Sequence, residues 1–295
     1  MAKRKFDRTE EDLGNFVHLE HVNVTIPDQQ LATLFYIAGL GLTRDPYMMV
    51  STNNMWATIG RSQFHLPTDT AQVLRGRIGL VMPDIEGLAR RLEAVREPLA
   101  DTKFDFVSPN GNDAIDVTCP WGNRFRCHMA GDRFYPVGLG MPYVEFDVPP
   151  GAADGIARFY REIIGTRATV GTWEDAPAAL VPTGNSQQLV FRESDAPQAA
   201  YDGHHIQVYV VDFSGPYQRL LERGLVSEES NQYQYRFVDI VDPDDGKVLF
   251  QIDHEVRALT HPLYARPLVN RNPDQHIRTY AQGYDTAGWA MPHAG

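Results

Sequence analysis

Strand-like and helix-like hydrophobic patterns alternate along the chain. Residues 21–28 (HVNVTIPD) alternate between apolar and polar side chains and end at a Pro-Asp turn, which is typical of a strand. Residues 31–42 (LATLFYIAGLGL) carry apolar side chains at helical spacing, with two glycines marking the end of a helix. Residues 143–150 (YVEFDVPP) and 156–165 (IARFYREIIG) repeat the same strand and helix. The pattern therefore predicts two related halves that begin in the same way.

A second strand and helix follow in each half. The strands are predicted at residues 77–84 (RIGLVMPD) and 205–212 (HIQVYVVD), and the helices at residues 85–95 and 216–223. Each half then closes with a strand, a turn containing proline and another strand. These closing segments are residues 116–128 and 239–252. The chain is thus expected to hold four strand–helix–strands modules, and its fold class is α+β with mixed sheets.

The length of 295 residues agrees with two domains, since one domain usually holds about 100–200 residues. The charged start is expected to be mobile. The aromatic-rich end has no helical or strand period, and we expect it to pack along the body, cover a cup mouth or reach a second subunit. The predicted segments are a mobile stretch (1–15), a first domain (16–131), a second domain (140–256) and an irregular C-terminal extension (257–295).

Charge and cysteine content narrow the classes of function. The formal net charge of −11 disfavours partners such as nucleic acid or an anionic membrane surface. No stretch approaches the roughly 20 apolar residues that span a bilayer, and the start (MAKRKFDR) lacks the apolar run of a signal peptide. Cys119 and Cys127 lie in one short segment, which favours free thiols in a reducing compartment. We therefore expect a cytoplasmic protein with a small-molecule ligand or substrate, and a homodimer is compatible with these features.

Several motifs recur in the same order at similar spacing. They are the strand that ends in Pro-Asp, the helix that ends in Phe-Tyr and a glycine, and the closing hairpin at Asp242-Pro-Asp-Asp-Gly. In this order they resemble the vicinal oxygen chelate superfamily, which includes glyoxalase I, type I extradiol dioxygenases and the bleomycin resistance proteins. The resemblance covers roughly residues 16 to 255. It implies tandem paired βαβββ modules whose strands form two cup-shaped sheets, with a divalent metal in the cup of the active members.

In the metal-binding members, ligands come from the first and the closing strand of each module. In the first half these positions fall on His21, His65, Arg77 and Arg126. Imidazoles can bind a metal, whereas a guanidinium has no lone pair to give; His128, on the same strand face as Arg126, could replace it. We interpret this N-terminal cup as suited to an anionic ligand, a carboxylate or phosphate, held by the two arginines. The alternative is that these are surface or hydrogen-bonded core residues.

In the second half the same positions fall on Tyr143, Val190, His205 and a residue of the last strand. The apolar neighbours of Gln251 favour it over Phe250 at that last position. Glu145 shares a strand face with Tyr143, and we expect its side chain to converge with those of Tyr143, His205 and Gln251. The candidate metal ligands are His205, Glu145 and Gln251, and the candidate catalytic residues are His205, Glu145 and Tyr143.

Two alternatives remain for this C-terminal cup. The donor set could bind Fe, Mn or Zn, although Tyr143 stands where an extradiol dioxygenase has a histidine, which puts ring cleavage in doubt. Without a metal, Glu145 and His205 could act as base and acid on a C–H bond next to a carbonyl, or both could be structural.

The leading hypothesis is an enzyme of the glyoxalase or dioxygenase type that acts on a small oxygen-rich or aromatic molecule. A metal-dependent dioxygenase, lyase or isomerase is favoured, with the C-terminal cup as its active site. The rival hypothesis is a metal-free binding or sequestration protein of the bleomycin-resistance type. A third possibility, a structural or partner-binding protein, rests on the aromatic C-terminal extension alone.

Overall fold

The computed structural model describes residues 6–48, 52–107 and 114–270. Each predicted module begins with a strand, a helix and a return to the sheet. The first module holds β1 (Phe16–Asn23), α1 (Gln29–Ala32), its π-helical continuation η2 (Thr33–Gly39), β2 (Thr43–Arg44), β3 (Asn54–Ile59) and β4 (Ser62–Pro67). The second holds β5 (Gly76–Met82), α2 (Ile85–Ala94), β6 (Asp105–Val107), β7 (Ala114–Thr118) and β8 (Arg124–Met129).

The second half repeats this order after a short turn, η3 (Asp132–Phe134). The third module holds β9 (Gly140–Val148), α3 (Ala153–Phe159), its π-helical continuation η4 (Tyr160–Ile164), β10 (Thr169–Trp173), β11 (Ala176–Pro182) and β12 (Gln188–Glu193). The fourth holds β13 (His205–Val210), α4 (Ser214–Leu221), β14 (Val226–Asn231), β15 (Gln234–Val241) and β16 (Val248–Ala258). The α+β class and the four βαβββ modules are confirmed.

The modules form two eight-stranded mixed sheets, ordered β14-β15-β16-β13-β1-β4-β3-β2 and β10-β11-β12-β9-β5-β8-β7-β6. At the centre of each sheet, the first strands of two modules pair antiparallel: β1 with β13, and β5 with β9. On either side, each first strand pairs parallel with the closing strand of its own module. Each sheet therefore has an approximate twofold relation between its two modules.

The module partners differ from the expectation that each half closes its own cup. The first module shares a sheet with the fourth, and the second with the third. The expected N-terminal and C-terminal cups are therefore wrong as groupings of residues. The reason is that the first strand of every module has one edge free to pair with another module. The repeat along the chain therefore does not specify which two first strands pair. The segments 16–131 and 140–256 stay a prediction as domains, but both sheets draw on both of them.

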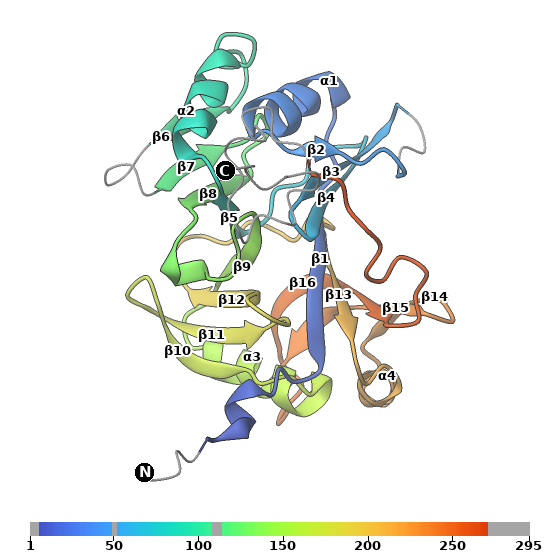
Figure 1. Cartoon of the computed structure of the whole chain (residues 1–295). Coiled ribbons are helices and arrows are strands. Elements are labelled where there is room, and N and C mark those ends of the chain that lie inside the picture. The colour runs from blue at the N-terminus through green and yellow to red at the C-terminus, as the bar shows by residue number, and fades with distance from the viewer. Residues whose placement is uncertain (1–5, 49–51, 108–113, 271–295) are drawn as a thin grey trace, which may run out of the picture.

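The apolar core lies between the two sheets, and the helices close it at two ends (Figure 1). From η2, Phe35 packs against Phe125 of β8, and Tyr36 packs against Phe64 of β4, so this helix touches both sheets. From η4, Tyr160 makes the equivalent contacts, to Phe191 in one sheet and to a strand of the other. Because side chains alternate along a strand, the opposite face of each sheet is left to form a cup.

The two ends of the chain meet the body in different ways. Of the predicted mobile stretch, residues 1–5 lie outside the described part, and Arg8–Glu11 forms a short 3-10 helix. The last strand continues to Ala258, and the chain then runs over the first module. There Arg266 Nη2 lies 2.6 Å from Asp45 Oδ2, and Asn270 Nδ2 donates to the carbonyl of Gly60 at 2.9 Å. The remaining predicted extension, 271–295, lies outside the described residues.

Candidate functional site

The central strands of the first sheet place two histidines next to each other. In the antiparallel pair of β1 and β13, His21 lies opposite Gln207, and His205 lies opposite Asn23. The apolar residues between them, such as Val22, face the core. His21 and His205 are therefore equivalent residues of two modules, and both point to the concave face.

The closing strands add one residue each at equivalent positions. In β4, the residue opposite His21 is Gln63, and His65 follows two residues later on the same face. In β16, the residue opposite His205 is Asp253, and Glu255 follows at the same spacing. We call the concave face that carries His21, His65, His205 and Glu255 the histidine cup.

The three imidazoles of the histidine cup converge. One ligand nitrogen of each lies within 4.8 Å of those of the other two. The ring centroids are 5.9 Å apart for His21 and His65, and 5.6 Å for His21 and His205. Glu255 Oε2 lies 3.5 Å from His205 Nε2, so a carboxylate stands beside the group. Three imidazoles and a carboxylate form a donor set suited to Fe²⁺, Mn²⁺ or Zn²⁺.

The free nitrogens of these histidines test whether a metal fits. Within the described part of the chain, the Nε2 atoms of His21, His65 and His205 are all buried without a hydrogen-bond partner. Burial lowers the pKa of all three, that of His65 to about 3, and the guanidinium of Arg257 lowers them further. Each imidazole is therefore neutral near pH 7 and keeps a lone pair on one nitrogen. Buried polar atoms normally have partners, so three unpartnered nitrogens around one point fit a metal well.

A second carboxylate, on the same face of the sheet, orients one of the histidines. Glu20 Oε2 lies 3.4 Å from His21 Nδ1 and accepts from Arg257 Nη1 at 3.0 Å. A carboxylate can only accept from the imidazole, so the proton belongs on Nδ1 and the lone pair on Nε2. Outer carboxylates of this kind fix the tautomer and orientation of metal-binding histidines.

Two arginines line the rim of the donor set. Arg236 Nη1 lies 2.6 Å from Asp253 Oδ2, and its other terminal nitrogen contacts Glu255. Arg257 joins Glu20 and Glu255, at 3.0 and 2.5 Å. The three carboxylates exceed the two guanidiniums by one negative charge, which favours a cation in the cup.

The opposite wall is aromatic. Trp56 stacks on His65 with ring centroids 3.9 Å apart and planes 15° from parallel, and its ring also meets His21 edge-on at 5.0 Å. Trp56 lies directly opposite His65 in the pairing of β3 with β4. The indole therefore fixes the plane of the His65 ring and gives the cup an apolar side.

The other predicted residues meet in the second sheet. Arg77 pairs with Glu145 across β5 and β9, and its Nη2 lies 2.7 Å from Glu145 Oε2. By strand register, Arg77, Arg126, Tyr143 and Val190 take the places that His21, His65, His205 and Glu255 take in the first sheet. We call this face the arginine cup. Glu145 and Tyr143 therefore lie in a different sheet from His205, and their expected convergence with it does not occur.

Three other residues considered from the sequence, Gln251, Phe250 and His128, do not join the donor set of the histidine cup. Gln251 is exposed and donates from Nε2 to Asp239 at 2.8 Å, while Phe250 is buried in the core. His128 Nε2 lies 2.9 Å from the Tyr143 hydroxyl inside the arginine cup, where burial lowers the pKa of His128 to about 4.

Sequence reasoning missed Glu255, Glu20 and Trp56. Glu255 has the same strand parity as Gln251 but lies four residues further along, because β16 is long and its pairing with His205 begins late. An acidic residue at that parity, in a strand that pairs with a histidine strand, was a usable signal. The roles of Trp56 and Glu20 could not be inferred from the sequence, because they depend on contacts that form only in the folded chain.

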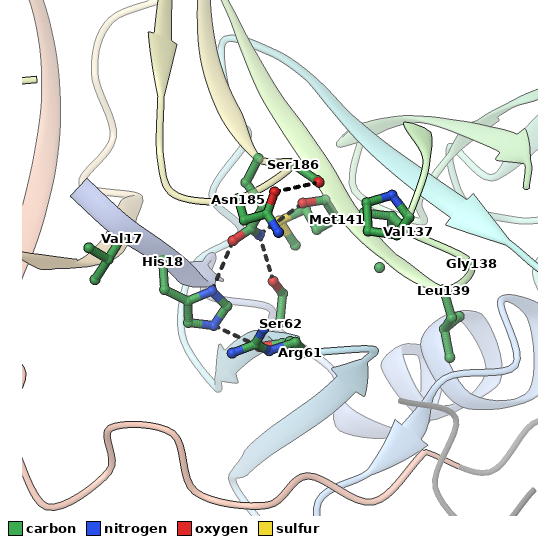
Figure 2. Close-up of a pocket in the computed structure, with 13 residues that line it drawn as sticks. Val17, His18, Arg61, Ser62, Val137, Gly138, Leu139, Met141, Asn185 and Ser186 are labelled. Carbon is green, nitrogen blue, oxygen red and sulfur yellow. Dashed lines mark hydrogen bonds between the residues drawn. The ribbon is translucent and has the colours of Figure 1, made fainter. Parts of the chain in front are cut away.

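One cavity lies between the two sheets, and another lies beside β1 of the first sheet. The first, about 210 Å³, is lined by His18 and Ser62 of one sheet and by residues 137–141 and 185–187 of the other (Figure 2). Gln187 crosses this junction, since its Nε2 donates to Ser62 Oγ and Met141 O, both at 3.0 Å. A second cavity of about 290 Å³ is lined by Glu20 and by residues 264–268, and so lies between the first sheet and the segment that follows β16.

Comparison with solved structures shows the same fold in enzymes. Glyoxalase I from Zea mays is 11% identical, with a TM-score of 0.57, and the match covers 82% of this chain and 92% of that one. A candidate dioxygenase from Bacillus subtilis is 14% identical, with a TM-score of 0.52 over 82% of this chain and 85% of the other. No family model and no curated protein matches the sequence. In the described residues, no helix is long and apolar enough to cross a membrane. The chain thus has the fold of glyoxalases and related dioxygenases, as the resemblance to the vicinal oxygen chelate superfamily predicts.

Proposed function

We propose that the chain is a divalent-metal-dependent enzyme of the glyoxalase or dioxygenase type, with its active site in the histidine cup. The observation that carries the proposal is the set of three buried, unpartnered Nε2 atoms on His21, His65 and His205. A site evolved only to hold an organic molecule would not need three neutral imidazoles aimed at one point. Glu255 is the candidate fourth donor.

The surrounding side chains favour a small, oxygen-rich substrate. A divalent metal in the cup would act as a Lewis acid that binds two adjacent oxygens and stabilises negative charge on them. Arg236 and Arg257 lie beside the donor set and would favour an anionic form of the substrate. Trp56 provides the apolar wall against which a flat substrate can rest.

Glu255 is also the carboxylate best placed to take a proton from a bound substrate. It is buried, lies 3.5 Å from His205 Nε2 and is held by Arg257 at 2.5 Å. A positioned carboxylate of this kind suits proton abstraction next to a carbonyl, the chemistry of an isomerase or lyase. The predicted base and acid pair of Glu145 and His205 does not form; in this proposal Glu255 takes the role of the base and His205 holds the metal.

The proposal is tested by metal titration followed by a substrate panel. Chelator-treated protein is titrated with Mn²⁺, Zn²⁺ and Fe²⁺ by calorimetry, and one tight site per chain is expected. Reconstituted protein is then assayed with catechols for oxygen uptake and with 2-oxoaldehyde hemithioacetals for isomerisation, to identify the reaction class. Absence of a stoichiometric metal site would overturn the proposal and favour the metal-free binding protein.

A further inference from the structure

The arginine cup carries two guanidiniums at positions where the histidine cup carries neutral imidazoles. Arg77 and Arg126 stand where His21 and His65 stand, and they enclose an anion instead of a cation site. That anion is the side chain of Glu174. Its Oε2 lies 2.7 Å from Arg77 Nη2, and its Oε1 lies 2.7 Å from Arg126 Nη1. The chain itself therefore supplies a carboxylate bound between two guanidiniums.

Each arginine is held in place without Glu174. Arg126 is bound by both oxygens of Asp116, at 2.8 and 2.9 Å. Arg77 is bound by Glu145, which also accepts from Trp173 Nε1 at 2.8 Å. The Nε atom of Arg77 is buried and has no hydrogen-bond partner among the residues that the structure describes. The two guanidiniums thus form a preorganised anion site with an unused donor, and Glu174 is its occupant rather than its support.

The backbone conformation at Glu174 also supports a ligand-binding role for this cup. Glu174 and Asp175 form the two-residue turn between β10 and β11, with φ of 46° and 64°. Such turns favour glycine, asparagine and aspartate, because a left-handed conformation is unfavourable for other residues. A glutamate here costs backbone energy, and strained positions of this kind cluster at ligand sites and switches. The position of its carboxylate between the two arginines accounts for a glutamate at this strained position.

We propose that the arginine cup is a binding site for small carboxylates, which Glu174 occupies until a ligand carboxylate displaces it. The side chains of Glu174 and Arg126 are 34% and 21% exposed, so exchange needs only the hairpin tip to move and not the core to open. Exchanging one carboxylate for another leaves the charge of the cup unchanged.

A cavity lies next to the turn. Trp173, which precedes Glu174, lines a cavity of about 460 Å³ together with Phe134 and Arg133. The Arg133 guanidinium carbon lies 5.5 Å from the centre of the Trp173 ring. The cavity gives the apolar part of a carboxylate ligand a place to rest, and Arg133 adds a positive charge at its entrance.

The experiment is a calorimetric titration with sodium acetate at constant ionic strength, with chloride as the balancing anion. Glu174→Gly removes the tethered carboxylate and suits the positive φ. It should bind acetate more tightly than the wild type, in which the tethered carboxylate competes at roughly millimolar effective concentration; the gain is about tenfold for an acetate Kd of about 0.1 mM at the empty site. Asp175→Gly makes the same backbone change one residue away and keeps the occupant, so its affinity should equal that of the wild type.

Two further variants fix the location of the site and guard against misfolding. Arg126→Gln in the Glu174→Gly background should abolish the gained affinity, and Glu174→Asn, which also accepts a positive φ, should reproduce the gain. Equal acetate affinity of Glu174→Gly and Asp175→Gly would overturn the proposal, as would a gain that survives Arg126→Gln. The proposal does not depend on a metal in the histidine cup, whose content should be unchanged in all of these variants.

Discussion

Glu255 stands in the fourth module where His65 stands in the first. Each lies two residues beyond the strand partner of its module's leading histidine, His205 or His21. The closing strands of the two modules, β4 and β16, therefore contribute equivalent residues to one donor set. The histidine cup therefore exists only because the first and fourth modules share a sheet.

The two glutamates of the two cups should behave differently toward metal. Glu255→Gln should weaken metal binding by about 10–100-fold, because it removes a carboxylate next to the donor nitrogens. Glu145→Gln is the matched control, since Glu145 binds Arg77 in the other sheet. Metal affinity measured by competition with a chromogenic chelator separates them. Equal losses in both variants would mean that the assignment of the cups is wrong.

Glu20 should act through His21 rather than by touching metal. Glu20→Gln keeps the size of the side chain but weakens its hold on the Nδ1 proton of His21. We expect metal affinity to fall about tenfold, with Glu20→Asp recovering part of the loss. Cobalt-substituted protein provides the readout, because the visible spectrum of Co²⁺ follows the ligand geometry. A Glu20→Gln variant with an unchanged spectrum and affinity would leave Glu20 a purely structural residue.

Buried histidines should make the fold sensitive to acid. Burial lowers the pKa of His254 to about 3, while an unfolded chain takes up the proton near pH 6.5. The stabilising effect is fully present above about pH 6.5 and is lost as the pH falls toward 3, by about 1.4 kcal/mol per pH unit. Urea unfolding between pH 7 and 4 should show a shallower pH slope for His254→Gln than for the wild type. Parallel slopes would mean that His254 takes up its proton without unfolding.

Tyr143 should be sensitive to a methyl group on the strand opposite it. A Cβ at Gly79 would lie 2.2 Å from Cε1 of the Tyr143 ring, whereas a Cβ at Gly131 meets no atom of the described residues within 4 Å. We expect Gly79→Ala to lower the free energy of unfolding by about 1–3 kcal/mol, and Gly131→Ala to change it by less than about 0.5 kcal/mol. Chemical denaturation of both variants checks this, and an unaffected Gly79→Ala would show that the Tyr143 ring has room to move.

Much of the fold was predictable because local patterns specify modules. The alternation at β1, β5, β9 and β13 and the glycines that end the helices identify all four repeats. The partner of each module was not predictable from these patterns, because pairing depends on contacts between strands far apart in the chain. As a result, strand position placed His21, His65 and His205 among the candidates but assigned them to two different cups.

Charge complementarity between candidate residues could have predicted which modules share a sheet, whereas the repeat could not. Two arginines at ligand positions need carboxylates, and Glu145 was available in the third module. Pairing Arg77 with Glu145 would have joined the second module to the third and left the histidines together. Strand parity was a usable signal for Glu255, although its register in the long strand β16 was not predictable. Glu174 could not be predicted, since its contact depends on a turn that folds back over the cup.

The central claim is that the histidine cup holds a divalent metal. The most direct measurement is the metal content of untagged protein, purified without chelator and analysed by inductively coupled plasma mass spectrometry. We predict close to one Fe, Mn or Zn per chain in the wild type and in His128→Gln, a control in the other sheet. Less than about a tenth of that should remain in a variant with both His65→Ala and His205→Ala, with its thermal midpoint within a few degrees of the metal-free wild type. A wild-type protein that contains and takes up no divalent metal, or a double variant that retains it in full, would contradict the account.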